Sequence, residues 1–371
     1  MNKIPYAMVV GTYLPYSETF IYDQLLRARA FKPFVWAREL APDFAGRFPY
    51  ENVVGLGFFE RLKYVLGLGS KTFGRQLERE NLQFIHAHFG LDGTLAMPLA
   101  LKAKKPLAVT FHGIDVGVFL GKKIPLAYSV YARNFKKMFE VASLLLPVSE
   151  ELANGLVSLG APQEKIQVHR LGIDLQKFKM LRRPERAVRF LMCGRLVEKK
   201  GFEFGLRAFA KIAKKFQDAS LNIVGRGPLE LKLRNLAALC GVSNRVRFLG
   251  AIDTFLMPSV FGEFDVFVAP CVVAGNGDRD SGLLELKEAG ATGMVSVGTF
   301  CGGLPEIVDQ GESGFLVAQR NVGELAEAME TLAKDYQLRI RMGGCARRKM
   351  ERDYDTVRQN ERLENFLRQL I

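Results

Sequence analysis

The sequence predicts an α/β protein of two domains, each a parallel sheet with crossover helices. Short apolar strands alternate with helical patterns along the chain. The alternation restarts near the middle of the 371 residues, a length that suits two domains better than one core. Between the halves, segment 173–187 is polar, basic and carries a proline, so it is predicted to be the linker.

The first half is expected to hold six strands, each a short apolar run, at 6–12, 34–38, 84–88, 107–113, 143–149 and 165–172. Helical recurrence of apolar residues predicts the helices between them, at 18–30, 58–80, 92–104, 125–140 and 150–159.

In the second half, strands are predicted at 188–195, 221–227, 245–250, 266–270 and 294–298. The matching helices are predicted at 201–217, 228–240, 281–291 and 321–333. Since ligands of such sheets bind beyond the carboxyl ends of the strands, a ligand cleft is expected between the two domains.

Composition limits the partners. The formal net charge of +13 favours anionic ligands or partners. Zinc-finger spacing, RNP aromatics and a disordered basic arm are all missing from the sequence, so we expect no nucleic acid. Anionic lipid headgroups and phosphorylated small molecules remain. Five scattered cysteines without a C-x-x-C, together with no long apolar run or signal-peptide pattern, predict a cytoplasmic protein without disulfides or structural zinc.

The strand at 188–195 leads into CGRLVEKKG, where Arg195 and Lys200 precede a helix. A guanidinium, an ammonium and helix-terminal N–H groups make an anion site, although a P-loop pattern is absent. A solvated basic loop is the alternative. The next strand ends in VGRGP, where Gly225 and Gly227 predict a tight turn near a base or ribose rather than a dinucleotide fingerprint.

Two strand ends of the first half also carry candidates. Gly11 follows the first strand, where glycine permits close approach of a ligand or simply forms a turn. Ser17 and Glu18 suit the start of the next helix. His112 ends the fourth strand in FHGID, which is equally consistent with a structural histidine and with a group that faces the cleft.

The most unusual stretch is GDRDSGLLELKEAG, which gathers four carboxylates in a basic protein: Asp278, Asp280, Glu285 and Glu288. If the stretch were helical throughout, the eight residues from Asp280 to Glu288 would span about 12 Å. That span suits the two ends of a long, hydroxyl-rich ligand bridged by a diphosphate. Because carboxylates on helices are common, this spacing supports a ligand site only together with the diphosphate site predicted at Arg195 and Lys200.

Together these segments resemble a known family. FHGID, PVSE, VHRLGID, CGRLVEKKG, IVGRGP, RVRFLG, the D-x7-E pair and CGGLPEIVDQGESGFLV occur in order over about residues 9–317. Their combination is similar to retaining glycosyltransferase family 4, and SETF and GDRD resemble its bacterial exopolysaccharide and lipopolysaccharide enzymes. The resemblance implies the GT-B fold, two Rossmann-like domains facing an interdomain cleft.

The resemblance also implies roles for the donor side. Arg195, Lys200 and Gly11 would bind the donor diphosphate. The transferred sugar would lie against His112, Asp280 and the loop formed by Ser281, Gly282, Leu283 and Leu284. The nucleoside would lie against Glu288, Gly225, Arg226, Phe248 and Leu249. His112, Asp280 and Glu288 would carry the catalysis, and Glu18 and His88 would face the acceptor.

The implied activity is retaining, metal-independent transfer of a sugar from a UDP- or GDP-sugar to a glycan or lipid-linked acceptor in cell-surface polysaccharide biosynthesis. The acceptor domain would span 1–172, the donor domain 173–352, and a last helix at 353–371 would return to the first domain. No cofactor is expected, because Arg195 and Lys200 supply the cationic charge. Asp280 replaces the usual Glu, and a nucleotide-sugar epimerase or a catalytically silent nucleotide-sugar-binding partner remain alternatives.

Finally, segment 58–77 spaces apolar residues at helical intervals among basic ones. Such a helix can lie in a membrane interface. It can equally pack into a core. Because acceptors of polysaccharide assembly are often lipid-linked, we expect a peripheral, salt-sensitive association of the first domain with the anionic inner face of the cell membrane.

Overall fold

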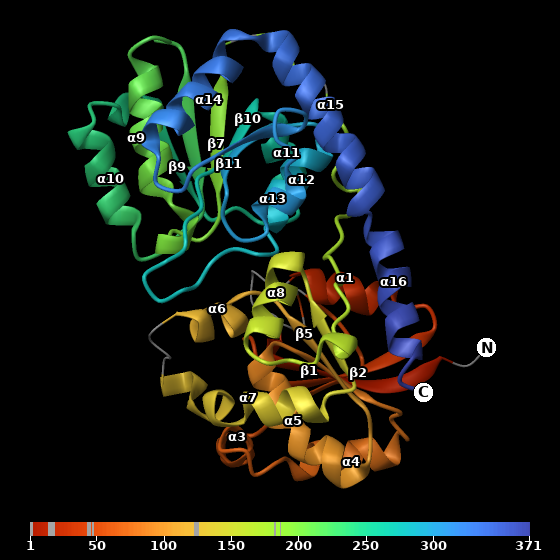
Figure 1. The fold of residues 1–371 in the computed structure, drawn as a ribbon. Coiled ribbons are helices and arrows are strands. Elements are labelled where there is room, and N and C mark those ends of the chain that lie inside the picture. The colour runs from red at the N-terminus through yellow and green to blue at the C-terminus, as the bar shows by residue number, and fades with distance from the viewer. Residues whose placement is uncertain are drawn as a thin grey trace. The chain divides into compact units, whose positions relative to one another are not determined.

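The computed structural model describes residues 3–13, 19–42, 46, 48–121, 126–181, 183–185 and 187–371 (Figure 1). The chain forms two compact units. Unit 1 comprises Met1–Gly172 and Val357–Ile371, and unit 2 comprises Ile173–Thr356. The first division falls at the predicted position, and the return into unit 1 comes four residues later than the predicted 353. The α/β prediction is confirmed, because each unit holds its own six-stranded parallel sheet.

The sheet of unit 1 has the order β3-β2-β1-β4-β5-β6. Its strands are β1 (Ile4–Tyr13), β2 (Phe31–Leu40), β3 (Val53–Gly55), β4 (Ile85–His88), β5 (Leu107–Phe111) and β6 (Leu144–Pro147). Its helices are α1 (Thr19–Arg27), α3 (Phe58–Val65), α4 (Lys71–Arg79), α5 (Gly90–Ala103), α6 (Ile114–Leu120), α7 (Ser129–Val141), α8 (Glu150–Ser158) and α16 (Thr356–Arg368), with 3₁₀ turns at Leu126–Tyr128 and Gln163–Lys165.

The last helix closes the core of unit 1. The rings of Tyr6 and Phe84 stack 4.8 Å apart on the sheet, and Leu363 and Leu367 of α16 join the same buried cluster. The Glu364 carboxylate accepts hydrogen bonds from the backbone N–H groups that follow α1, at 2.6 and 2.9 Å. These bonds satisfy amides at the end of α1, so the C-terminal helix completes unit 1 although most of the chain lies between them.

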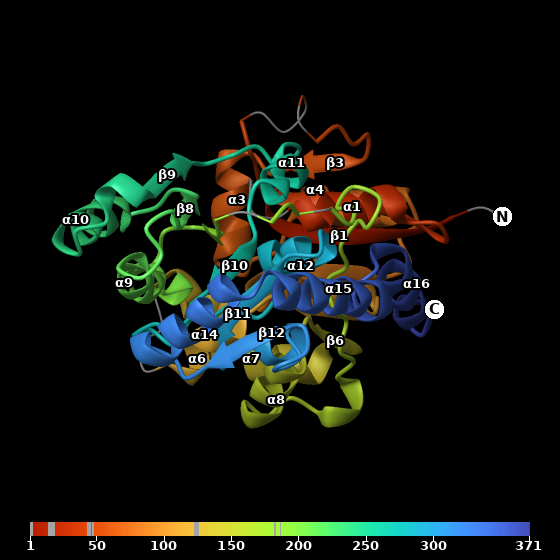
Figure 2. The same ribbon diagram turned by 90° about the horizontal axis from the view of Figure 1, so that it is seen from above.

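The sheet of unit 2 has the order β12-β11-β10-β7-β8-β9 (Figures 1 and 2). Its strands are β7 (Arg189–Cys193), β8 (Ser220–Val224), β9 (Val246–Gly250), β10 (Val266–Ala269), β11 (Val295–Thr299) and β12 (Gly314–Val317). Its helices are α9 (Phe202–Ala213), α10 (Glu230–Leu239), α11 (Met257–Gly262), α12 (Leu284–Ala291), α13 (Leu304–Ile307), α14 (Val322–Lys334) and α15 (Tyr336–Asp353), with 3₁₀ turns at Glu198–Lys200 and Ser243–Arg245. Helices α12 and α15 lie side by side (Figure 2).

The strand prediction at 165–172 is wrong. This segment runs beside β6 and makes a single bridge, Leu145 with Ile166, before it turns away. The N–H groups of Gln167 and His169 donate to carbonyls of β6, so its backbone is paired without a continuous ladder. The edge strands β3 and β12 and helices α6, α11, α13 and α15 were not predicted as elements. The two strands have three and four residues, fewer than the usual five or six.

The single helix predicted at 58–80 is two helices. Gly67 and Gly69 adopt positive φ angles of 80° and 73°, which favour glycine and end α3. The side chain of Ser70 then caps α4 by accepting from the N–H of Phe73 at 3.1 Å. The break turns α3 and α4 into separate helices with different surroundings.

The predicted linker belongs to unit 2. Ile173 and Phe178 lie in its core. The buried Arg183 guanidinium donates to the carbonyls of Phe264 at 2.8 Å and Thr292 at 2.7 Å. A polar and basic composition therefore does not mean a solvated segment here, because the backbone of unit 2 satisfies the arginine.

Candidate active site

Each sheet reverses its strand order once, in unit 1 between β1 and β4 and in unit 2 between β7 and β10. Helical crossovers on either side of such a point go to opposite faces, which leaves a crevice at the carboxyl ends of the two central strands. In unit 2 those ends are followed by Gly194 and Pro270, and in unit 1 β4 ends at His88. The candidate residues gather at these two reversals.

At the reversal in unit 2, two lysines meet three carboxylates. The Lys200 ammonium lies 2.9 Å from Asp280 Oδ2 and 3.3 Å from both carboxylate oxygens of Glu285. Lys199 lies 3.1 Å from Asp278 Oδ1 and 3.2 Å from Asp280 Oδ1. The fold thus brings CGRLVEKKG and GDRDSGLLELKEAG into direct contact. The sequence predicted a ligand role for each stretch but not the ion pairs between them.

These contacts fix the charge states. Burial by itself would raise the pKa of Asp280, but Lys200 and Lys199 lower it by more, so its pKa lies well below the usual range. Burial would lower the pKa of Lys200, yet Asp280 and Glu285 raise it well above the usual range. Asp280 is therefore a carboxylate and Lys200 an ammonium at neutral pH, and each stabilises the charge of the other.

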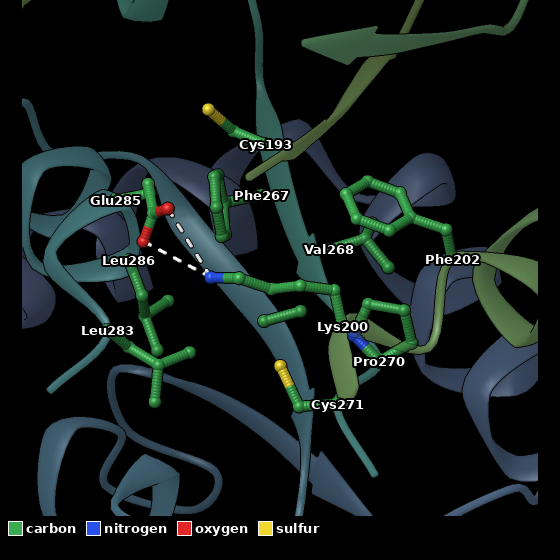
Figure 3. A pocket seen from close by; sticks show the side chains of 11 residues that line it. Cys193, Lys200, Phe202, Phe267, Val268, Pro270, Cys271, Leu283, Glu285 and Leu286 are labelled. Carbon is green, nitrogen blue, oxygen red and sulfur yellow. Dashed lines mark hydrogen bonds and ion pairs between the residues drawn. The ribbon is translucent and has the colours of Figure 1, made fainter. Parts of the chain in front are cut away.

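Figure 3 shows the pocket around Lys200, with the ammonium directed at the Glu285 carboxylate. Cys193 at the end of β7 and Cys271 after β10 also line it. Burial raises the pKa of both thiols well above the usual range, so they are protonated. The thiols act as apolar lining, and the lysine and the carboxylates provide the chemistry.

Two glycines let the loops approach each other this closely. A Cβ on Gly201, which has φ 62°, would lie 1.9 Å from the carbonyl oxygen of Pro270. A Cβ on Gly225, which has φ 132°, would lie 1.9 Å from the carbonyl oxygen of Gly194. Any side chain at these positions would push apart the strand ends that form the pocket.

The loop after Asp280 is strained. Helix α12 begins only at Leu284, so Ser281, Gly282 and Leu283 are not helical and the prediction of a helix from 281 is wrong. Leu283 adopts the left-handed region, with φ 31°. This conformation costs a residue with a Cβ on the order of 1–3 kcal/mol and concentrates at ligand sites. Asp280 therefore precedes a turn that leads into α12, and it does not share a helical face with the residues of that helix.

The predicted nucleoside residues lie on neighbouring strand ends. The N–H of Gly225 donates to the carbonyl of Gly250 at 2.7 Å, and the N–H of Leu196 donates to the carbonyl of Arg226 at 2.9 Å. The side chains of Arg195, Arg226 and Leu249 are exposed. The Phe248 ring is instead covered by the Arg234 guanidinium, 4.4 Å from its centroid. Glu288 lies on α12, partly buried.

At the reversal in unit 1, His88 and His112 form a pair. His88 Nδ1 lies 3.1 Å from His112 Nε2, and the rings stack at 16° with centroids 5.3 Å apart. Burial lowers the pKa of His112 to about 3 and that of His88 well below its usual value. His112 is therefore a neutral hydrogen-bonding group at neutral pH rather than a cation.

A buried carboxylate anchors this pair. Asp115 accepts hydrogen bonds from the backbone N–H groups of Gly90 at 3.0 Å, His112 at 3.2 Å and Gly113 at 2.9 Å. Burial raises its pKa to about 6. Next to His88, Phe89 has φ 70°, a strained conformation, and its ring lies 4.5 Å from that of His112.

Gly11 has a different neighbour from the predicted one. A Cβ there would lie 2.5 Å from Arg38 Nη2, so glycine leaves room for the guanidinium. Arg38 Nε donates to the buried Asp92 at 2.8 Å. A place for Gly11 beside the diphosphate stays a prediction, and Ser17 and Glu18 lie outside the described residues.

Three residues of the site were missed. Lys199 adjoins the predicted Lys200, and in the sequence Glu285 is only one of the four carboxylates of its stretch. Asp115 is the last residue of FHGID, and only its hydrogen bonds with buried backbone N–H groups reveal its role.

Among the described residues, no group of three or more His, Cys, Asp or Glu side chains is placed to hold a metal ion. Within the same residues, no helix is long and apolar enough to cross a membrane.

Comparison with known proteins identifies the family. Residues 24–177 match the family model described as Glycosyltransferase Family 4, and residues 187–335 match that described as Glycosyl transferases group 1. The two matches and the paired parallel sheets define a glycosyltransferase of the GT-B fold. The chain belongs to glycosyltransferase family 4.

Three similar proteins illustrate the relationship. The putative colanic acid biosynthesis glycosyltransferase WcaL of Salmonella typhimurium is 29% identical over 76% of this chain and 69% of its own. A GDP-mannose-dependent phosphatidylinositol monomannoside mannosyltransferase of Mycobacterium tuberculosis is 29% identical over 74% of each chain. The solved structure of Anabaena HepE in complex with UDP aligns over 100% of this chain and 100% of its own, with a TM-score of 0.80. At 18% identity this likeness shows the fold.

Proposed function

We propose that the protein transfers a sugar from a nucleoside diphosphate sugar, UDP- or GDP-linked, to a glycan or lipid-linked acceptor in cell-surface polysaccharide biosynthesis. The observation that carries the proposal is the buried Lys200, held by Asp280 and Glu285 at the strand reversal of unit 2. A diphosphate needs a cation there, and the carboxylates suit sugar hydroxyls. The names of WcaL, of the GDP-mannose-dependent enzyme and of the UDP complex support this chemistry.

In this proposal Lys200 exchanges the Glu285 carboxylate for phosphate oxygens, while the exposed Arg195 closes on the diphosphate. Glu288 binds the ribose hydroxyls. Asp280 and the backbone of 281–284 hold the transferred sugar, and the neutral His112 donates to or accepts from one of its hydroxyls. The developing charge on the leaving diphosphate is stabilised by the two cations. Transfer proceeds with retention, with a departing phosphate oxygen taking the acceptor proton.

The proposed reaction needs no metal. Asp278 and Asp280 form the D-x-D pattern that would otherwise suggest one, but Lys199 bridges both carboxylates and Lys200 binds the second. We expect donor binding and turnover to persist after treatment with a chelator. Loss of activity that added Mg²⁺ or Mn²⁺ restores would reject this part of the proposal.

Replacing Arg195 with Ala should weaken donor binding without affecting folding. A charge-assisted hydrogen bond contributes about 1.5–3 kcal/mol, which is roughly ten- to hundredfold in affinity. Thermal-shift titrations with UDP-, GDP-, ADP- and dTDP-sugars measure this, because a ligand that binds only the folded state raises the melting temperature. The matched control is Arg207→Ala, an exposed arginine on α9.

Equal donor affinity in wild type and Arg195→Ala would remove Arg195 from the diphosphate site. Transfer is then tested by incubating the best donor with extracted lipid-linked saccharides and determining the anomeric configuration of the product by NMR. Isomerised nucleotide sugar formed without an acceptor would instead indicate an epimerase. Tight donor binding with neither transfer nor slow hydrolysis would indicate a silent binding partner.

We also propose that unit 1 docks on an anionic membrane through α3. The structure divides the predicted amphipathic segment: Phe73 is fully buried and stacks on Trp36 at 4.8 Å, whereas α3 presents its apolar side chains to solvent. The exposed fractions are 67% for Phe58, 80% for Phe59 and 54% for Leu62 on α3, and 61% for Leu66 and 73% for Leu68 just after it. Only Tyr64 of α3 is buried.

Basic side chains accompany this apolar face. Lys63, Lys71 and Arg75 are exposed, and Arg61 lies 3.1 Å from Glu39 and over the Phe58 ring. An apolar face next to exposed lysines and an arginine complements an anionic bilayer, where each nearby cation adds about 1 kcal/mol. A lipid-linked acceptor would then be presented at the same surface.

The double variant Phe58→Ser with Phe59→Ser should reduce co-sedimentation with anionic liposomes by about tenfold or more, because burying one Phe contributes roughly 1.5–3 kcal/mol. The control variant carries Leu231→Ser and Leu239→Ser, equally exposed leucines on α10 in unit 2. Wild-type binding should fall at high salt. Equal binding to neutral liposomes, or no effect of the phenylalanine changes, would contradict docking through α3.

A further inference from the structure

All four histidines of the chain lie in unit 1, and three of them form a row across β4 and the end of β5. The rings of His86 and His88 have centroids 4.7 Å apart, and those of His88 and His112 are 5.3 Å apart. His86 Nε2 bonds Thr110 Oγ1 at 2.8 Å, whereas His88 Nδ1 bonds His112 Nε2 at 3.1 Å. His112 is thus connected to its neighbour through a ring nitrogen.

Both members of the bonded pair are neutral at neutral pH. Burial, and then the neighbouring imidazoles, lower the pKa of His88 and His112. A neutral imidazole carries one N–H and one bare nitrogen, so each ring exists as one of two tautomers. The hydrogen bond between the rings requires a proton on one of the two facing nitrogens and a lone pair on the other.

This requirement couples the tautomers. If His88 carries its proton on Nδ1, it donates to a bare Nε2 of His112, and His112 then carries its own proton on Nδ1. If His88 carries its proton on Nε2, its bare Nδ1 accepts from His112 Nε2–H, and Nδ1 of His112 is bare. The two rings must therefore hold the same tautomer, and His88 decides whether Nδ1 of His112 is a donor or an acceptor.

We propose that His88 is a positioning residue that sets the tautomer and the ring orientation of His112 toward the donor sugar. The part of the inference that concerns the sugar rests on the proposed function. His112 Nδ1 is buried and makes no hydrogen bond within the described part of the chain, so it is available to a ligand. Asp115 fixes the backbone of His112 through its N–H, which leaves the ring angle to His88 and to the adjacent Phe89 and Phe20 rings.

Imidazole ¹⁵N NMR on the ligand-free full chain tests the coupling directly, because only four histidines contribute signals. In wild type at neutral pH, the spectra should show His88 and His112 neutral and in the same tautomer. His88→Phe keeps the ring volume but removes both nitrogens, and should shift His112 to a mixture of tautomers. His88→Asn keeps a donor and an acceptor near the position of Nδ1 and should restore one tautomer.

The matched control is His86→Phe, which removes a buried ring of the same strand and should leave the His112 tautomer unchanged. Slow hydrolysis of the donor sugar gives a second readout. We expect kcat to fall about ten- to hundredfold in His88→Phe at unchanged donor affinity, as for a misplaced reacting group, and to recover partly in His88→Asn.

Opposite tautomers in wild type, or a His112 signal identical in wild type and His88→Phe, would overturn the coupling. The NMR result does not depend on a donor, so its failure is separate from that of the proposed function. Coupled tautomers with no donor binding or turnover by the wild-type protein would count against the proposed function and against the sugar as the ligand of His112.

Discussion

Acidification should unfold unit 1 steeply below about pH 6, the pH range in which free histidines gain protons. Burial lowers the folded-state pKa of His86, His88 and His112, that of His112 to about 3. The unfolded chain therefore binds up to three more protons than the folded chain, and stability falls with pH by up to about 4 kcal/mol per unit. The stabilisation is present above the unfolded-state pKa and is lost as pH falls toward the folded values.

Asp115 opposes this trend. Because its folded pKa is raised to about 6, its contribution is present below its unfolded value and is lost as pH rises through the folded value. Between about pH 5.5 and 4 the net loss from these four groups is thus at most about 3 kcal/mol per unit as pH falls. Asp92 reduces it further, because burial raises its pKa too. A unit with an ordinary stability of about 5–15 kcal/mol should lose most of it within a few pH units.

The fluorescence of the sole tryptophan measures this transition. Trp36 is fully buried in unit 1, so urea titrations at several pH values follow this unit alone. His86→Phe should reduce the slope of stability against pH by about 1.4 kcal/mol per unit, the contribution of one proton. A slope that is the same in this variant would show that His86 is protonated in the folded protein. A stability independent of pH between 6 and 4 would show the same of all three histidines.

Replacing Lys200 with Met should destabilise unit 2 by about 3 kcal/mol and abolish donor binding. Lys200 is only 10% exposed and offsets the buried Asp280 as well as Glu285, and removal of one partner from such a pair leaves an uncompensated charge.

A double-mutant cycle separates the two roles. Adding Asp280→Asn to Lys200→Met should recover part of the lost stability, since one of the two carboxylates that lost Lys200 is gone, while donor binding should stay lost. The control Lys232→Met breaks an exposed pair with Glu203 and should change the free energy of unfolding by less than about 1 kcal/mol. Full stability of Lys200→Met, measured by calorimetry, would contradict this charge compensation.

The prediction from sequence was strongest for the repeated βα pattern and for short motifs at strand ends. Arg195, Lys200, Asp280 and His112 were all identified because they follow apolar strands. The errors arose where local pattern and tertiary packing disagree. The segment at 165–172 has the apolar pattern of a strand but makes one bridge only, and the basic linker is packed into unit 2 because Arg183 finds buried carbonyls.

The sequence by itself determined the class of fold, the family and the strand ends at which the chemistry is placed, since periodicity and loop motifs are local properties of the chain. The tertiary structure alone decided which groups compensate one another. Lys200 meets Asp280 across some eighty intervening positions, and His88 meets His112 from a neighbouring strand. Such pairings depend on sheet order, and their charge and tautomer states depend on burial. The spacing of the residues along the chain predicts neither the pairings nor these states.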